Sequence, residues 1–191
     1  MATTNSQRIG IWVIAGVLLV GTLGSFIAMM LAPANQQIDA AEQQKQLAAY
    51  QEQQKAAAEE RAKTVEPLDG YAAAPFDGAA VKELQKEVLV EGSGDVVKES
   101  DTINVSYFGW LADGRIFDSS KVKGTNTPID LPLTGVIAGW TEGLKDQKVG
   151  STIKLTIPAE KAYGAQASGI IPANAPLTFI VTINSIGKAT S

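Results

Sequence analysis

The sequence predicts an α+β protein in which a curved antiparallel β-sheet is wrapped on one short α-helix, preceded by a transmembrane helix and a helical stalk. Two observations predict the sheet and its helix: apolar residues alternate at period two through the C-terminal half, and only one short stretch there suits a helix. Alternation indicates strands with one exposed face, which is typical of antiparallel sheets. A third observation is that the first 80 residues change from an apolar run to a polar, helix-forming run.

The composition excludes several kinds of chemistry. The 191 residues include no cysteine and no histidine, and the net charge is −4. Disulfides, zinc sites with Cys or His ligands, and Ser-His-Asp or Cys-His catalysis are therefore excluded. The weakly acidic balance argues against a nucleic-acid binder, which needs a basic face. We expect no metal and no cofactor, and any chemistry must use carboxylates, hydroxyls, backbone groups or an apolar surface.

Residues 9–32 form an almost wholly apolar stretch that predicts a transmembrane helix. As a helix this stretch would be about 36 Å long, and a bilayer core is about 30 Å thick. A cleaved signal peptide is the alternative, because Ala32-Pro33-Ala34 resembles a small-x-small cleavage site, although the apolar region is longer than such peptides have. An uncleaved anchor in the lipid bilayer fits the length better.

The charges around this stretch predict its orientation. Arg8 and the terminal amine precede the span, and the first base after it is Lys45. By the positive-inside rule, residues 1–8 lie in the cytoplasm. We therefore expect a single-pass protein of the cell membrane with its C-terminal domain outside the cytoplasm.

Residues 35–64 are expected to form a helical stalk. Asn35–Lys63 contains no Gly or Pro and is rich in Ala, Gln, Glu, Lys and Leu, which are strong helix formers. A dimerising coiled coil is the alternative, but Lys45 and Glu52 fall where its heptads require apolar residues. A solvated helix therefore fits the pattern better.

A linker is expected over residues 65–80, because Val65–Ala80 holds two Pro and two Gly without periodicity. The remaining 81–191 is then one domain of ordinary size with its own core. Lys86–Glu91 is expected to be a strand, and the short helix is expected around Ile137–Leu144. Three further strands are predicted by alternating faces, which are Ile103, Val105 and Tyr107; Ile153, Leu155 and Ile157; and Leu177, Phe179, Val181 and Ile183.

Three sequence blocks in this domain resemble the signature of FKBP-type peptidyl-prolyl isomerases. Residues 105–120 (VSYFGWLADGRIFDSS) follow the pattern V-x-Y-x-G-x-L-x-D-G-x-x-F-D-S-S. Residues 136–144 (VIAGWTEGL) follow V-I-x-G-W-x-E-G-L, and residues 162–179 follow A-Y-G with I-P-x-x-x-x-L-x-F. The blocks span most of residues 81–187, and no such resemblance covers residues 1–80.

The resemblance implies an FKBP-like fold and a catalytic pocket for proline. It implies that the Ile137 N–H and the Tyr163 hydroxyl donate hydrogen bonds to substrate carbonyls, with Asp118 at the pocket edge. Ile129 stands at a pocket position where an aromatic residue is common. The catalytic residues implied are Tyr107, Phe117, Asp118, Ile137, Trp140, Tyr163 and Phe179, and the substrate-binding residues are Val136, Ile129 and Ile171.

The implied partners are Xaa-Pro segments of unfolded or exported proteins, and macrolides of the tacrolimus and rapamycin kind. Prolyl isomerisation breaks no covalent bond, so a chain without His or Cys can catalyse it. What the reaction needs is an apolar site for the proline ring and fixed donors for neighbouring carbonyls. The alternative function is a membrane-tethered binding or chaperone module without significant isomerase activity.

Overall fold

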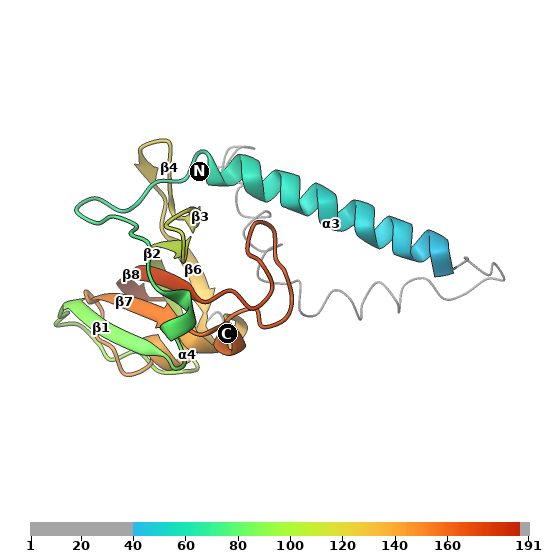
Figure 1. The fold of residues 1–191 in the computed structure, drawn as a ribbon. Coiled ribbons are helices and arrows are strands. Elements are labelled where there is room, and N and C mark those ends of the chain that lie inside the picture. Colours follow the sequence, from blue (N-terminus) through green and yellow to red (C-terminus); the bar gives the residue numbers. More distant parts are fainter. Residues whose placement is uncertain (1–39, 188–191) are drawn as a thin grey trace. The chain divides into compact units, whose positions relative to one another are not determined.

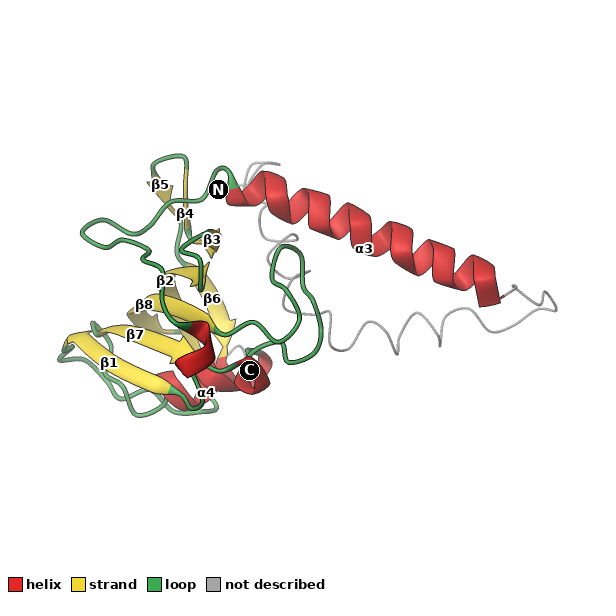
Figure 2. Ribbon diagram, in the orientation of Figure 1, coloured by secondary structure: helices red, strands yellow, loops and turns green. Residues whose placement is uncertain are grey.

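The computed structural model describes residues 40–187, which fold into helices and antiparallel strands (Figures 1 and 2). The helices are α3 (Ala40–Ala62) and α4 (Ala138–Leu144), with short 3-10 turns η1 (Gly78–Ala80), η2 (Leu133–Gly135) and η3 (Ala159–Lys161). The strands are β1 (Gln85–Val90), β2 (Thr102–Leu111), β3 (Ile116–Ser119), β4 (Lys121–Val122), β5 (Thr125–Asn126), β6 (Ile129–Pro132), β7 (Thr152–Ile157) and β8 (Leu177–Ile186).

Among the described residues, the main sheet has the strand order β1-β7-β8-β2-β3, and β6 also pairs with β2. Every pairing is antiparallel, and β4 and β5 form a small separate hairpin. The register of β2 shifts against β8 between Asn104 and Val105 and against β3 between Gly109 and Trp110. Such irregularities bend a strand. The predicted antiparallel sheet and its short helix are confirmed.

The predicted apolar faces form the core on the side of the sheet that carries α4 (Figure 2). All ten alternating residues predicted on β2, β7 and β8 are buried. The helix lies very close to β7, since a Cβ at Gly139 would come within 2.4 Å of Ile157 and one at Gly143 within 2.6 Å of Leu155. Two glycines four residues apart share one helix face, and here they let that face approach the strand.

The opposite face of the sheet is also covered. Residues 65–81, which we call the strap, cross this face (Figure 1). Leu68 of the strap is 7% exposed and belongs to one cluster with Phe108, Trp110 and Ile180 of the sheet. The strap is fixed by a hydrogen bond of 2.8 Å from the Trp110 indole Nε1 to the Ala74 carbonyl oxygen. The second half of β2 is therefore buried on both faces, which corrects the expectation of half-exposed strands.

The strap also changes the expected domain boundaries. Val65 is buried and forms an antiparallel bridge with Val122, so the range expected to be a linker packs against the sheet. The compact unit that contains the sheet begins at Ala56, inside α3. The folded domain thus starts upstream of residue 81, because strap side chains complete its second core.

Within the range expected to be a stalk, the structure has the helix α3 over Ala40–Ala62. Its residues Leu47 and Tyr50 are exposed, as a solvated helix requires. The expected transmembrane helix at 9–32 and the cytoplasmic residues 1–8 lie outside the described part of the chain. Within residues 40–187, no helix combines the length and the apolar character needed to cross a membrane.

Candidate functional site

Four buried aromatic side chains meet on the α4 side of the sheet, and we call them the aromatic cluster: Tyr107, Phe117, Trp140 and Phe179. The Trp140 ring, on α4, lies edge to face with those of Tyr107 and Phe179, each with a centroid distance of 5.3 Å. The Phe117 ring lies 5.5 Å from that of Phe179, also edge to face. Edge-to-face pairs are a favoured aromatic geometry, so these rings hold one another in place.

Gly109 makes room for this cluster on the central strand β2. It pairs with Phe179 of β8 on one side and with Asp118 of β3 on the other. A Cβ at this position would lie 2.5 Å from Phe179 and 2.7 Å from Phe117, closer than side chains tolerate. The two phenylalanine rings therefore occupy the space that a side chain at position 109 would fill.

The Asp118 carboxylate lies beside the cluster and is bound from two directions. Its Oδ2 accepts the hydroxyl proton of Tyr107, and its Oδ1 accepts the N–H of Ser119 at 2.9 Å. Arg61, in the last turn of α3, donates from Nε to Oδ1 at 2.8 Å. The Asp118 and Arg61 side chains are only 20% and 19% exposed, so this ion pair is partly shielded from water.

The two serines after Asp118 are used structurally. Ser119 and Ser120 are buried, and both hydroxyls lie within hydrogen-bond distance of the Tyr107 carbonyl oxygen. The N–H of Tyr107 donates to the Ser120 hydroxyl at 2.9 Å, and the Ser119 hydroxyl lies 2.7 Å from the Glu66 carbonyl oxygen. These bonds fix the backbone of Tyr107 and hold the residue that follows Asp118 against Glu66.

Two predicted donors stand near the cluster without protein acceptors. Ile137 precedes α4, and its carbonyl accepts the N–H groups of Trp140 and Thr141. Within residues 40–187, its own N–H meets no acceptor, and neither does the half-buried Tyr163 hydroxyl. The indole Nε1 of Trp140 is buried and likewise has no partner among the described residues. Unpaired buried donors are rare in proteins.

The remaining predicted residues lie around these groups. Val136 directly precedes Ile137 and is half-buried. Ile129 is half-buried on β6, where it pairs with Val105 two residues before Tyr107. Ile171 is buried in the loop between η3 and β8 and exchanges backbone hydrogen bonds with Ser168.

Burial changes the acidity of both tyrosines. The pKa of Tyr107 is raised well above its ordinary value by desolvation first and by the neighbouring Asp118 second. The same two causes, in the same order, raise the pKa of Tyr163 to about 12. Both hydroxyls therefore stay protonated, and able to donate, throughout the neutral and mildly alkaline range.

The raised pKa of Tyr163 predicts alkaline destabilisation. Because the folded state binds this proton more tightly than the unfolded state, the free energy of unfolding falls as the pH rises from about 10 to about 12. We expect the Tyr163→Phe variant to lose less stability over this interval than the wild-type chain, measured by urea unfolding at each pH. An identical decline in both proteins would contradict the assignment.

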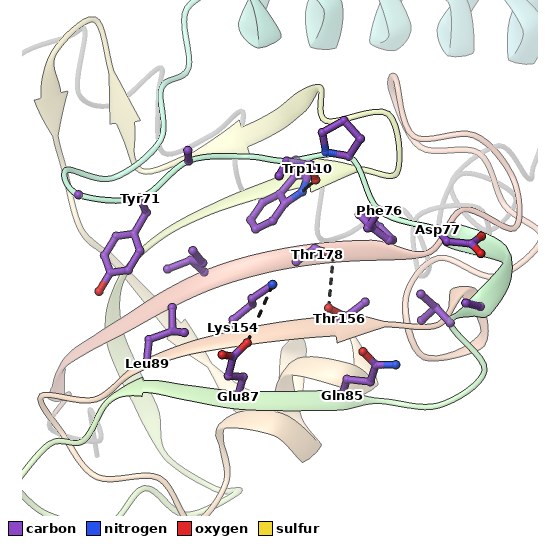
Figure 3. A pocket seen from close by; sticks show the side chains of 17 residues that line it. Tyr71, Phe76, Asp77, Gln85, Glu87, Leu89, Trp110, Lys154, Thr156 and Thr178 are labelled. Atoms are coloured by element: carbon purple, nitrogen blue, oxygen red, sulfur yellow. Dashed lines mark hydrogen bonds and ion pairs between the residues drawn. The ribbon is translucent and has the colours of Figure 1, made fainter.

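A separate hollow of about 570 Å³ lies on the strap side of the sheet (Figure 3). Trp110, Thr156 and Thr178 line it from the sheet, and Tyr71 and Phe76 line it from the strap. These sheet residues alternate with the core residues that face α4, so the hollow lies on the face opposite the aromatic cluster. It contains none of the predicted site residues.

Sequence reasoning missed Gly109 and Arg61. Gly109 carries a signal, because it is the glycine of the V-x-Y-x-G pattern, but its role needs the positions of Phe117 and Phe179. Arg61 carries almost none: it lies 57 residues before Asp118 in a stretch expected to be a solvated stalk. Only the tertiary structure brings its guanidinium to the carboxylate.

Comparison with known proteins points to one family. A family model described as FKBP-type peptidyl-prolyl cis-trans isomerase matches residues 94–184. The chain is 46% identical over 103 residues to the FKBP-type peptidyl-prolyl cis-trans isomerase FkpA of Escherichia coli (strain K12), covering 54% of this chain and 37% of that protein. It thus spans little more than a third of this relative.

Two further proteins are matched over most of their length. FK506-binding protein 1 of Dictyostelium discoideum is 40% identical over 97 residues, which are 50% of this chain and 91% of the relative. A peptidyl-prolyl cis-trans isomerase from Pseudomonas syringae pv. tomato has a crystal structure with a TM-score of 0.50 and 26% identity, covering 73% of this chain and 92% of its own. The chain belongs to the FKBP-type peptidyl-prolyl cis-trans isomerase family.

Proposed function

We propose that this protein accelerates the cis-trans interconversion of Xaa-Pro peptide bonds. One observation carries the proposal: the aromatic cluster lies close to two donors, the Ile137 N–H and the Tyr163 hydroxyl, that meet no acceptor among the described residues. An apolar surface can accept a proline ring, and free donors can bind the carbonyls that flank it.

The mechanism is non-covalent. Resonance in the C–N bond sets a rotational barrier of about 18–20 kcal/mol, and the twisted amide at the top of the barrier has lost that resonance. The proline ring lies on Trp140 between the other rings of the cluster, where water is excluded. Fixed donors at Ile137 and Tyr163 hold the twisted form without reorganising, so they favour the transition state over the planar amide.

The other predicted residues complete the proposed site. Asp118 lies at its edge and fixes the Tyr107 hydroxyl, and Phe117 and Phe179 form its aromatic wall. Val136, Ile129 and Ile171 supply apolar surface around the residues that flank the proline. FK506, which the name of the Dictyostelium relative mentions, is proposed to compete for the same surface.

We also propose that the enzyme is held in the cell membrane by residues 9–32, with its domain outside the cytoplasm. The apolar length of this stretch and the position of Arg8 before it support this topology. The substrates would then be proline-containing segments of exported or surface proteins during folding. Release of the chain from membranes by alkaline carbonate would contradict the anchor.

Proline-limited refolding tests the proposed activity. We expect the full chain in detergent to accelerate refolding of a substrate whose slow phase is an Xaa-Pro isomerisation. Loss of one hydrogen bond to the substrate should lower kcat/KM of the Tyr163→Phe variant about tenfold, since about 1.4 kcal/mol corresponds to a factor of ten. The matched control is Tyr50→Phe, the same change at an exposed tyrosine of α3, which should retain full activity.

Two results would contradict the proposal. Equal activity of Tyr163→Phe and wild type would remove the hydroxyl from the mechanism. No acceleration by the wild-type chain would exclude the isomerase and leave the alternative, a membrane-tethered binding module. Titration with a short Ala-Pro peptide would then decide whether the aromatic cluster binds proline at all.

A further inference from the structure

The last turns of α3 contact the candidate site at two separate places. The first is the ion pair in which Arg61 donates to the Asp118 carboxylate; its Nη2 also lies 3.3 Å from the Ser119 carbonyl oxygen. The second is the loop before β8, where a Cβ at Gly169 would come within 2.7 Å of the Ala58 side chain. The end of α3 thus contacts both Asp118 and the loop that carries Ile171.

The chain that leaves α3 fixes this arrangement. The Thr64 N–H and hydroxyl both donate to the Arg61 carbonyl oxygen, at 2.9 and 2.8 Å. The Thr64 carbonyl accepts the N–H of Lys123, and the Glu66 N–H donates to the Lys121 carbonyl. Arg61 is therefore held by backbone pairing to the segment that directly follows Asp118.

No other base takes the place of Arg61. Lys121 is engaged with Asp69 and Glu66, and among the described residues Arg61 alone lies within ion-pair distance of Asp118. Burial lowers the pKa of Arg61, but Asp118 and Tyr107 raise it more, so the guanidinium is charged at every working pH. A permanent cation thus faces the carboxylate that accepts the Tyr107 hydroxyl.

We propose that Arg61 is a positioning residue of the isomerase site, which holds the Asp118 carboxylate and, through it, the Tyr107 ring of the aromatic cluster. The end of α3 is then part of the site, and it is more than a spacer between the folded domain and the N-terminal part of the chain. This inference rests on the proposed function. Without Arg61, the partly buried carboxylate would rotate toward water, and the Tyr107 hydroxyl would lose its acceptor.

A double-mutant cycle measured on activity tests this role in the full chain. The four proteins are wild type, Arg61→Ala, Asp118→Asn and the double variant, each with its folded fraction determined by urea unfolding. We expect Arg61→Ala to lower kcat/KM about tenfold when Asp118 is present, and less than twofold in the Asp118→Asn background. A purely structural role would reduce activity equally in both backgrounds.

Two further variants sharpen the cycle. Arg61→Lys keeps the charge but loses the planar fork of donors, so it should recover part of the activity. Lys63→Ala is the matched control, because it removes a neighbouring cation that pairs only with the exposed Glu60. It should leave kcat/KM within twofold of wild type.

Equal losses in both backgrounds of the cycle, or no loss in Arg61→Ala, would overturn the inference. If the wild-type chain shows no isomerase activity, the proposed function fails, and the cycle is read instead on the dissociation constant of an Ala-Pro peptide. Coupling of Arg61 and Asp118 in peptide binding would keep Arg61 as a positioning residue of a binding site. Additive effects on binding would overturn it.

Discussion

Replacing Gly109 by Ala or Val is expected to damage the aromatic cluster more than any change of similar size elsewhere. The added Cβ would overlap Phe179 at 2.5 Å and Phe117 at 2.7 Å, so both rings must move. A misplacement of about 1 Å in a catalytic site can cost roughly 100-fold in rate. We expect kcat/KM in proline-limited refolding to fall by about tenfold for Gly109→Ala and by about 100-fold for Gly109→Val.

The matched control is Gly92→Ala, whose clash is at least as severe but involves no residue of the aromatic cluster. Its Cβ would lie 2.2 Å from the Val149 carbonyl oxygen, which is backbone and cannot move aside easily. We expect this variant to lose stability in urea but to retain its activity per folded molecule. The ratio of the loss in kcat/KM to the loss in the free energy of unfolding is compared between the two variants. If Gly92→Ala and Gly109→Ala give the same ratio, the clash at Gly109 lowers activity only because it destabilises the fold.

The sheet and its helix were predictable because the pattern of neighbouring residues along the chain determines which side chains share a face. Period-two alternation places Ile153, Leu155 and Ile157 on one face of β7 whatever surrounds the strand, and the structure buries all three. The site residues were identified through the sequence blocks, and the structure joins Tyr107, Phe117, Asp118, Trp140 and Phe179 by ring contacts and a hydrogen bond. Their roles in catalysis stay predictions.

The strap was not predictable from its own residues. Leu68, Tyr71 and Phe76 follow no helical or strand period, and the prolines and glycines around them are typical of a linker. Their positions are set by the far face of the sheet, which they cover. A signal was present in β2, where Tyr107-Phe108-Gly109-Trp110-Leu111 is apolar without alternation, a pattern that indicates burial on both faces.

Arg61 illustrates a different limit. A charged residue in a polar helix is usually solvated, and isolated surface ion pairs contribute little. What distinguishes Arg61 is the partly buried carboxylate opposite it, and no pattern in residues 35–64 encodes that carboxylate. The distance along the chain means that only the fold of the strap, which returns the chain to β4, brings the two charges together.

Removing the strap is expected to have the largest effect on stability of any change considered. A chain that starts at Val81 lacks the buried Val65 and Leu68 and the Ala74 carbonyl that accepts the Trp110 N–H. Burial of an aliphatic side chain contributes about 1.5–3 kcal/mol and a hydrogen bond about 1 kcal/mol, so the loss is about 4–7 kcal/mol. The free energy of unfolding of a whole domain is only about 5–15 kcal/mol, so residues 81–191 alone should be marginally stable or unfolded.

Urea unfolding and far-ultraviolet circular dichroism distinguish two truncations and one substitution. A chain that starts at Ala56 keeps the strap and Arg61, so it should unfold cooperatively at the midpoint of the full chain. The chain that starts at Val81 should show a much lower midpoint or no transition. Leu68→Ala in the full chain should lower the free energy of unfolding by about 2–5 kcal/mol, because it empties one buried position of the strap core.

Equal midpoints for the two truncations would mean that the strap covers the sheet without stabilising it. The isomerase domain would then begin at residue 81, and the bridge between Val65 and Val122 would contribute nothing measurable to its folding.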